Sequence, residues 1–162
     1  MKVPLRYLPN QLTRRDRQKQ ATELRSSRRL YRQGVYHGRP AMRSFHSRPS
    51  RHVTNARRVY HVDNIGPTRE LSVATGCSQK ALAKIVNKGA GAYYSSGSRP
   101  NQTAQSWGIA RLASAITAGK AAAVDYTILE RGCKPSSKAL RLAKTARRKY
   151  GHGTRKVPKV QA

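Results

Sequence analysis

Residues 89–132 are the longest stretch of this sequence that Lys and Arg do not dominate, and they contain its only tryptophan, Trp107. A folded core needs apolar side chains, so this stretch is the expected centre of the fold. Apolar residues recur at steps of two to four from Trp107 onward, which predicts a helix from about Gln102 to a stop at Gly119. A second helix is predicted over 120–131. Because both are rich in Ala, Ser and Gly, we expect a tightly packed helical hairpin.

The side chains expected to pack in this core come from the two helices and from the segment before them. They are Leu82, Ile85, Tyr93, Tyr94, Trp107, Leu112, Ile116 and Ile128.

Charge limits how much of the chain can join that core. The sequence has 34 Lys and Arg against 6 Asp and Glu, a net charge of +28. Residues 1–60 carry +14, 61–130 carry +3 and 131–162 carry +11. We therefore expect a mainly α protein with a small helical core over 61–133, a basic N-terminal arm with a helix over 1–60, and a basic C-terminal helix and tail over 134–162. Such a charge requires a polyanion or an acidic protein surface as partner.

Local signals divide the arms further. The first twelve residues, with two prolines, predict an extended arm, and Thr13 caps a helix that ends near Gln33, before Gly34. In residues 34–50 the apolar side chains do not recur with the period of a helix or a strand, which predicts a basic linker. Short helices are expected over 51–60 and from Ser137 to Tyr150, followed by a Gly- and Pro-containing tail.

Several classes of function are not favoured. Cys77 and Cys133 are the only cysteines and lack metal-type spacing, so we expect free thiols in a reducing compartment. No apolar run has the length of a membrane span, and the N-terminal residues lack the apolar region of a signal peptide, so we expect a soluble intracellular protein. The few carboxylates and histidines fit caps and ion pairs better than acid–base chemistry. We therefore expect no enzyme, cofactor, metal or small-molecule substrate.

Residues 67–89, PTRELSVATGCSQKALAKIVNKG, resemble the helix-turn-helix of bacterial repressors. Gly76 can turn the chain at positive φ, and Ser78 can cap the next helix. In a DNA reader, Ser78, Gln79, Lys80 and Lys84 would face the major groove. Two short helices at a Gly turn are common in helical proteins, so a purely structural role stays open.

Tyr93 and Tyr94 stand in an aromatic and polar segment that also contains Arg99. Aromatic rings beside arginine can stack on the bases of single strands. Packing of both tyrosines against the helical hairpin is the favoured alternative.

Three parts of the sequence are the run GAYYSSGSRPNQTAQSWGIARLASAITAGKAAAVDYTILERGCK, the opening KVPLRYLP and the run ATGCSQKALAKIVNKGAGAYYSS. Together they resemble a family of small, basic, uncharacterised proteins of giant double-stranded DNA viruses of algae and amoebae. The resemblance implies a protein made in the interior of an infected cell and packaged in the virion. It carries over no catalytic or binding residue.

Two functions remain. The first is a structural virion protein, a minor capsid or cement component whose basic arms bind acidic surfaces of other capsid proteins. The alternative is a nucleic-acid-binding protein that condenses double-stranded DNA or reads it with the helix-turn-helix. Composition favours the alternative, because phosphate neutralisation is the commonest use of such a charge. The arm-like ends and the alanine-rich core favour the virion protein, which is the function we expect.

Overall fold

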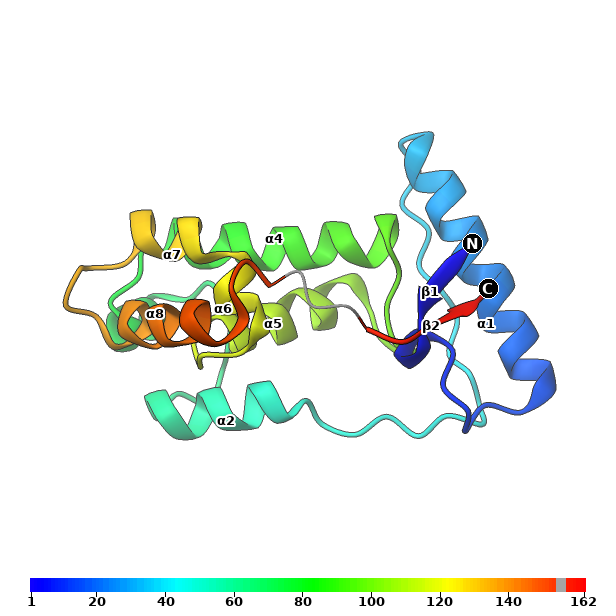
Figure 1. The fold of residues 1–162 in the computed structure, drawn as a ribbon, viewed down its shortest axis with the longest axis horizontal. Helices are drawn as coiled ribbons and strands as arrows, with labels where there is room; N and C mark the ends of the chain where they lie inside the picture. The colour runs from blue at the N-terminus through cyan, green and yellow to red at the C-terminus, as the bar shows by residue number, and fades with distance from the viewer. Residues whose placement is uncertain (154–156) are drawn as a thin grey trace. The chain divides into compact units, whose positions relative to one another are not determined.

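The computed structural model describes residues 1–153 and 157–162, and over these residues the protein is mainly helical, as predicted (Figure 1). Two short strands and a 3₁₀ turn accompany eight α-helices in this described part of the chain. Their order is β1 (Lys2–Pro4), the 3₁₀ turn (Leu5–Tyr7), α1 (Arg14–Arg32), α2 (Arg51–Tyr60), α3 (Arg69–Thr75), α4 (Gln79–Ser95), α5 (Ala104–Ala115), α6 (Lys120–Val124), α7 (Tyr126–Gly132), α8 (Lys138–Tyr150) and β2 (Lys159–Gln161).

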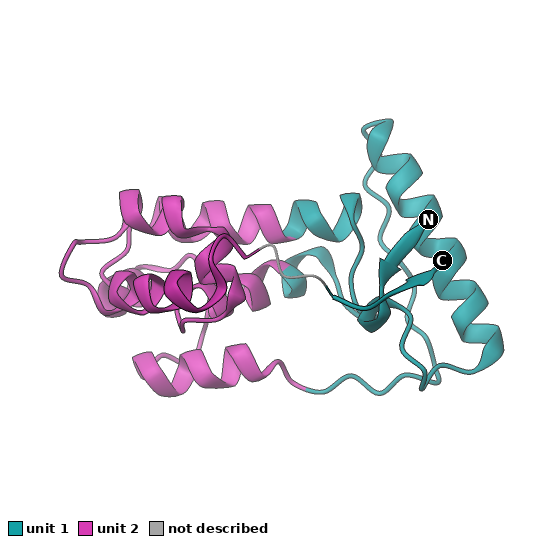
Figure 2. Ribbon diagram, in the orientation of Figure 1, with its two compact units in different colours: residues 1–48, 90–107, 156–162 teal, residues 49–89, 108–155 magenta. Residues whose placement is uncertain are grey.

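The chain divides into two compact units (Figure 2). Unit 1 comprises Met1–Arg48, Ala90–Trp107 and Lys156–Ala162, and unit 2 comprises Pro49–Gly89 and Gly108–Arg155. The boundaries of these units therefore differ from those of the three expected segments, 1–60, 61–133 and 134–162. Each has its own cluster of buried apolar side chains, and α4 and α5 contribute residues to both units. The expected C-terminal tail includes residues 154–156, which lie outside the described residues.

Unit 2 has the larger cluster. Its buried side chains include Leu71, Leu82, Ile85, Leu112, Ile116 and Leu129. Helices α6 and α7 pack against α8. Small residues allow close approach within this unit, because a Cβ added to Gly89 would lie only 2.6 Å from the Cα of Gly108.

The predicted core residues divide between the two units. Leu82, Ile85, Leu112 and Ile116 are buried in unit 2, and the half-buried Ile128 packs against the same cluster. Tyr93 is buried in unit 1, where Tyr94 is half-buried. Trp107 is also half-buried and packs in the smaller cluster of unit 1, edge-on to Tyr7 at 6.0 Å between ring centroids. Trp107 therefore does not share a core with Leu112 and Ile116, contrary to expectation.

The expected hairpin over residues 102–131 differs in its helix limits. Thr103 caps α5, since its Oγ1 accepts from the Ser106 amide at 3.0 Å, but the helix ends at Ala115. Gly119 is not a left-handed stop. It has φ −75° and precedes α6, while Ala118 takes the left-handed conformation at φ 58°.

The expected second helix is broken at Asp125 into α6 and α7. The Asp125 carboxylate is fully buried and accepts from the Arg111 guanidinium at 2.7 and 2.8 Å and from Lys88 Nζ at 3.0 Å. A buried carboxylate needs such partners. The two cations lie far from Asp125 in the sequence, and the periodic pattern did not reveal the break.

The expectation of free thiols is wrong, because Cys77 and Cys133 form a disulfide. The backbone brings them together: the two residues form an isolated antiparallel bridge in unit 2. The amide of Ser78 donates to the Gly132 carbonyl at 2.8 Å, and that of Lys134 donates to the Gly76 carbonyl at 2.9 Å.

In unit 1 the N-terminal segment is part of a core. β1 pairs antiparallel with β2, Lys2 opposite Gln161, and Val3, Tyr7 and Leu8 are buried with Leu24 of α1. The expected extended arm therefore folds back on its own chain, because its apolar residues have a partner helix in the same unit.

Helix α1 follows its predicted limits. The Thr13 side chain accepts from the Asp16 amide, and Gly34 adopts φ 77° just beyond the helix. Two of its buried residues, Gln20 and Ser27, are polar. Their side chains donate to the backbone carbonyls of Tyr7 and His37, so their burial leaves no unpaired polar atom.

Candidate nucleic-acid interface

Four arginines occupy one side of the second half of α1. Arg25, Arg28, Arg29 and Arg32 follow one another at steps of three, one and three residues, a spacing that groups side chains on one side of an α-helix. We call these four residues the arginine face. Arg29 and Arg32 lie in the last turn, where the helix dipole favours positive charge.

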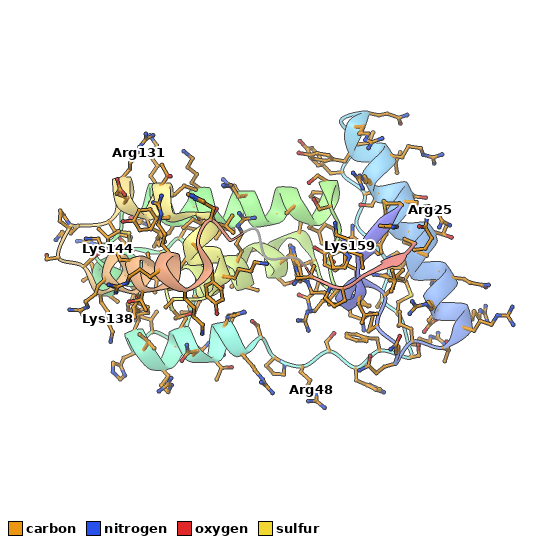
Figure 3. All side chains as sticks on the ribbon, viewed as in Figure 1. Arg25, Arg48, Arg131, Lys138, Lys144 and Lys159 are labelled. Atoms are coloured by element: carbon orange, nitrogen blue, oxygen red, sulfur yellow. A yellow bond between two sulfur atoms is a disulfide. The ribbon has the colours of Figure 1, made fainter. Side chains whose placement is uncertain are left out.

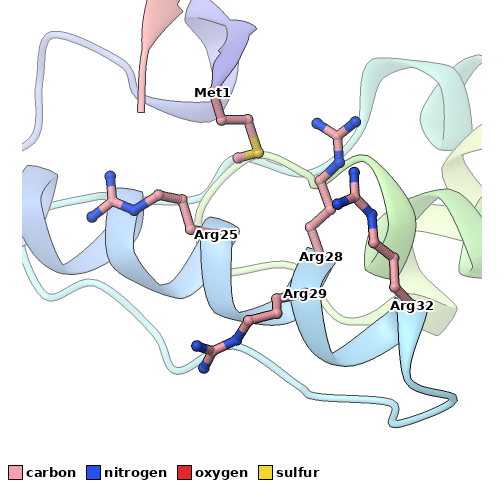
Figure 4. Close-up of a pocket in the computed structure, with 5 residues that line it drawn as sticks. All are labelled: Met1, Arg25, Arg28, Arg29 and Arg32. Atoms are coloured by element: carbon pink, nitrogen blue, oxygen red, sulfur yellow. The ribbon is translucent and has the colours of Figure 1, made fainter.

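The arginine face lines a pocket of about 320 Å³ together with Met1 (Figure 4). In this view Arg28 and Arg32 extend toward Met1, whereas the Arg29 side chain, which starts on the same side of the helix, turns away from Met1. The pairing of the terminal strands places Met1 there, since its carbonyl accepts from the Ala162 amide at 2.8 Å. The pocket thus has a positively charged floor and one apolar wall.

The carboxylates of unit 1 have other partners. This unit carries 16 Lys and Arg but only two acidic residues, Asp16 and Glu23. Asp16 accepts from the hydroxyl and amide of Ser44 at 2.6 and 2.9 Å, and the bond from the hydroxyl is the main cause that lowers the pKa of Asp16. Glu23 contacts His37 at 2.8 Å.

The charges of the arginine face are therefore not neutralised within the protein. Arg25 donates to the Thr22 hydroxyl at 3.2 Å, and among the described residues Arg28, Arg29 and Arg32 form no ion pair. Clustered guanidinium groups repel one another, and a bound anion relieves that repulsion. Guanidinium groups bind phosphate in bidentate geometry, so the pocket has the chemistry of a phosphate site.

Arg39 shows the contrast with a structural arginine. Its guanidinium donates to Ser27 Oγ, Ser98 Oγ and the Tyr93 carbonyl at 2.7–2.9 Å and lies 3.8 Å from the centroid of the Tyr93 ring. Burial lowers its pKa. Arg39 thus fastens the loop after α1 to the end of α4, and it is unavailable to a ligand.

The predicted helix-turn-helix is present in unit 2. α3 ends at Thr75, Gly76 has φ 77°, and Ser78 Oγ accepts from the Ala81 amide at 3.1 Å, so the turn and the cap form as predicted. The four predicted reader residues, Ser78, Gln79, Lys80 and Lys84, are all exposed.

Two features differ from the predicted interface. The side-chain amide of Gln79 donates to the Pro67 carbonyl at 3.3 Å, so it already has a partner within the unit. Arg99 is exposed but belongs to unit 1, so the structure does not group it with the four reader residues of unit 2.

Sequence reasoning predicted helix α1 but did not select its arginines as a site. The available signal was their three- and four-residue spacing together with the shortage of nearby carboxylates. What the sequence did not show is that Met1 closes one side of the pocket, because this depends on pairing between the two ends of the chain.

Basic side chains are also spread over both units. Unit 2 carries 18 Lys and Arg against four carboxylates. Arg48 and Arg131, for example, are exposed and extend away from the ribbon (Figure 3).

Within the described residues, no helix is both long and apolar enough for a membrane crossing. Nor does that part of the chain bring together three or more side chains suited to holding a metal ion.

A family model described as a family of unknown function (DUF5824) matches residues 4–141. No curated protein and no solved structure matches the chain.

Proposed function

The chain belongs to the DUF5824 family of unknown function, and we propose, from its own residues, that it is a non-enzymatic nucleic-acid-binding protein. In this proposal the arginine face of α1 binds the phosphate backbone. The remaining basic surface adds affinity that does not depend on sequence.

One observation carries this proposal: four arginines line a single pocket in a unit whose two acidic side chains both have other partners. Binding of nucleic acid by such a surface releases condensed counterions, which supplies most of the affinity of non-specific complexes. An acidic protein surface could also neutralise charge, but carboxylates are scattered on such surfaces, whereas phosphates are regularly spaced along a strand.

The virion role stays a prediction. It rested partly on extended arms that need an external surface, and in this structure the N-terminal segment is packed within unit 1. A capsid or cement protein with this fold would need another surface for its partners.

Sequence-specific DNA reading is a second candidate. It is favoured by the turn at Gly76, the cap at Ser78 and the exposed side chains at the start of α4. The hydrogen bond from the Gln79 side-chain amide to the Pro67 carbonyl argues against sequence-specific reading, because this bond would have to break before Gln79 could reach a base.

The experiment compares two variants that lose the same charge from the same unit. One carries Arg25→Gln, Arg28→Gln, Arg29→Gln and Arg32→Gln, and the control carries Arg14→Gln, Arg15→Gln, Arg43→Gln and Arg48→Gln. All of these arginines are exposed except Arg28, which is half-buried. Exposed charge pairs contribute about 0.2–1 kcal/mol each, so the loss of four such contacts should weaken binding of a labelled oligonucleotide by about 4- to 900-fold in fluorescence anisotropy. The control should lose clearly less. Equal losses in both variants would show that the arginine face is not a site, and circular dichroism checks that both proteins are folded.

A further inference from the structure

Three tyrosines meet at the end of α1 in unit 1. Tyr31 comes from the last turn of α1, Tyr36 from the loop that follows, and Tyr94 from the end of α4. Their ring centroids lie 5.9 Å (Tyr31–Tyr36), 6.4 Å (Tyr31–Tyr94) and 5.2 Å (Tyr36–Tyr94) apart, and the rings of Tyr31 and Tyr94 are nearly parallel, at 5°. We call these three residues the tyrosine cluster.

Packing behind the cluster fixes its position. The buried Tyr93 ring contacts Tyr94 edge-on at 5.0 Å between centroids, and the Arg39 guanidinium lies over the Tyr93 ring. Tyr93 is 1% exposed and is therefore packed, although its contacts here are Arg39 and Tyr94 and not the hairpin that was expected.

Tyr36 does not fit a purely structural role. It is 69% exposed although it contacts two other rings, and its neighbour Val35 is 47% exposed. A tyrosine held in place by aromatic neighbours, with most of its surface in water, offers a ring to a planar partner.

The tyrosine cluster lies beside the arginine face on α1. Tyr31 lies three residues after Arg28, and Arg32 lies four residues after Arg28. Side chains at these spacings are neighbours on a helix surface. A ligand that reaches both features must combine anionic groups with planar faces.

We propose that the ligand is a single-stranded nucleic acid, with a base stacked on Tyr36 of the tyrosine cluster and neighbouring phosphates bound by the arginine face. This inference rests on the proposed function and names its substrate class. Single strands present their base faces to aromatic side chains, whereas in a duplex those faces are stacked within the helix.

The test uses the full chain and three ligands of equal length: single-stranded oligo(dT), an abasic oligomer that keeps the phosphates but lacks bases, and a duplex. The variants are Tyr36→Ala and Tyr36→Phe, with Val73→Ala as a control that removes an exposed apolar side chain from unit 2. Because Tyr36 is exposed, its truncation should leave the fold intact.

Stacking of one base contributes about 1–3 kcal/mol, so Tyr36→Ala should weaken oligo(dT) binding by about 5- to 150-fold. The same variant should bind the abasic oligomer and the duplex as the unaltered protein does, and Tyr36→Phe should retain affinity for oligo(dT). Unchanged oligo(dT) binding by Tyr36→Ala, or an equal loss for the abasic oligomer, would overturn the inference.

The two proposals fail separately. If Tyr36→Ala has no effect while the arginine-face variant still loses affinity, the protein binds phosphates without stacking and only this inference falls. If the arginine-face variant behaves as its charge-matched control does, the proposed function falls, and the inference falls with it.

Discussion

Arginine has two distinct roles in unit 1, and the difference follows from what surrounds each guanidinium. Arg39 is enclosed by oxygen acceptors and an aromatic ring, and burial lowers its pKa. Arg28, Arg29 and Arg32 have no ion-pair partner in the described chain and line a pocket. Amino-acid composition does not distinguish these arginines, although Arg28, Arg29 and Arg32 are available to a ligand and Arg39 is not.

Arg39→Ala should destabilise unit 1 by about 2–4 kcal/mol, because it leaves the buried Ser27 and Ser98 hydroxyls and the Tyr93 carbonyl without their charged donor. Arg39→Lys should recover little, since an ammonium group cannot reproduce a planar fork of donors. Thermal and urea unfolding measure both. Arg43→Ala, at an exposed position in the same loop, is the control and should change stability by less than about 0.5 kcal/mol. A similar small effect for Arg39→Ala would contradict the role assigned to it.

At the scale of the element, the sequence predicted those helix ends that depend on local chemistry. The caps at Thr13 and Ser78, and the turns at Gly34 and Gly76, require only residues a few positions away. The break at Asp125 was missed because its partners Arg111 and Lys88 come from distant helices. Gly119 was misassigned because a glycine, although more common after a helix, also occurs as the residue that precedes one.

The pair α3–α4 allows a test of sequence reading. In our account the arginine face supplies binding, so Gln79→Ala with Lys80→Ala and Lys84→Ala should leave any preference among duplex sequences unchanged. Selection from a random duplex library measures this preference. Thr127→Ala with Lys144→Ala and Arg148→Ala is a control that removes the same charge from exposed positions of unit 2.

A sequence motif enriched by the unaltered protein and the control, but lost in the triple variant, would favour the helix-turn-helix reader instead. Each lost base contact would then cost about 1–3 kcal/mol of discrimination.

For the whole molecule, the sequence indicated the mainly helical class but not how the segments combine. Unit 1 joins both ends of the chain to residues 90–107, and unit 2 joins the segments that flank this stretch. The disulfide between Cys77 and Cys133 and the pairing of β1 with β2 connect residues far apart in sequence. Such contacts leave no periodic signal, and this is why the pocket between Met1 and the arginine face could not be predicted.

The central claim is that the arginine face contacts phosphates, and the salt dependence of binding tests it most directly. For single strands, the slope of log K against log salt concentration is about −0.7 for each phosphate neutralised. If all four arginines contact phosphates, the arginine-face variant should have a slope smaller in magnitude by up to about 3 than that of the unaltered protein. The variant altered at Arg14, Arg15, Arg43 and Arg48 should keep a slope close to that of the unaltered protein. Identical slopes for the unaltered protein and the arginine-face variant would contradict the account.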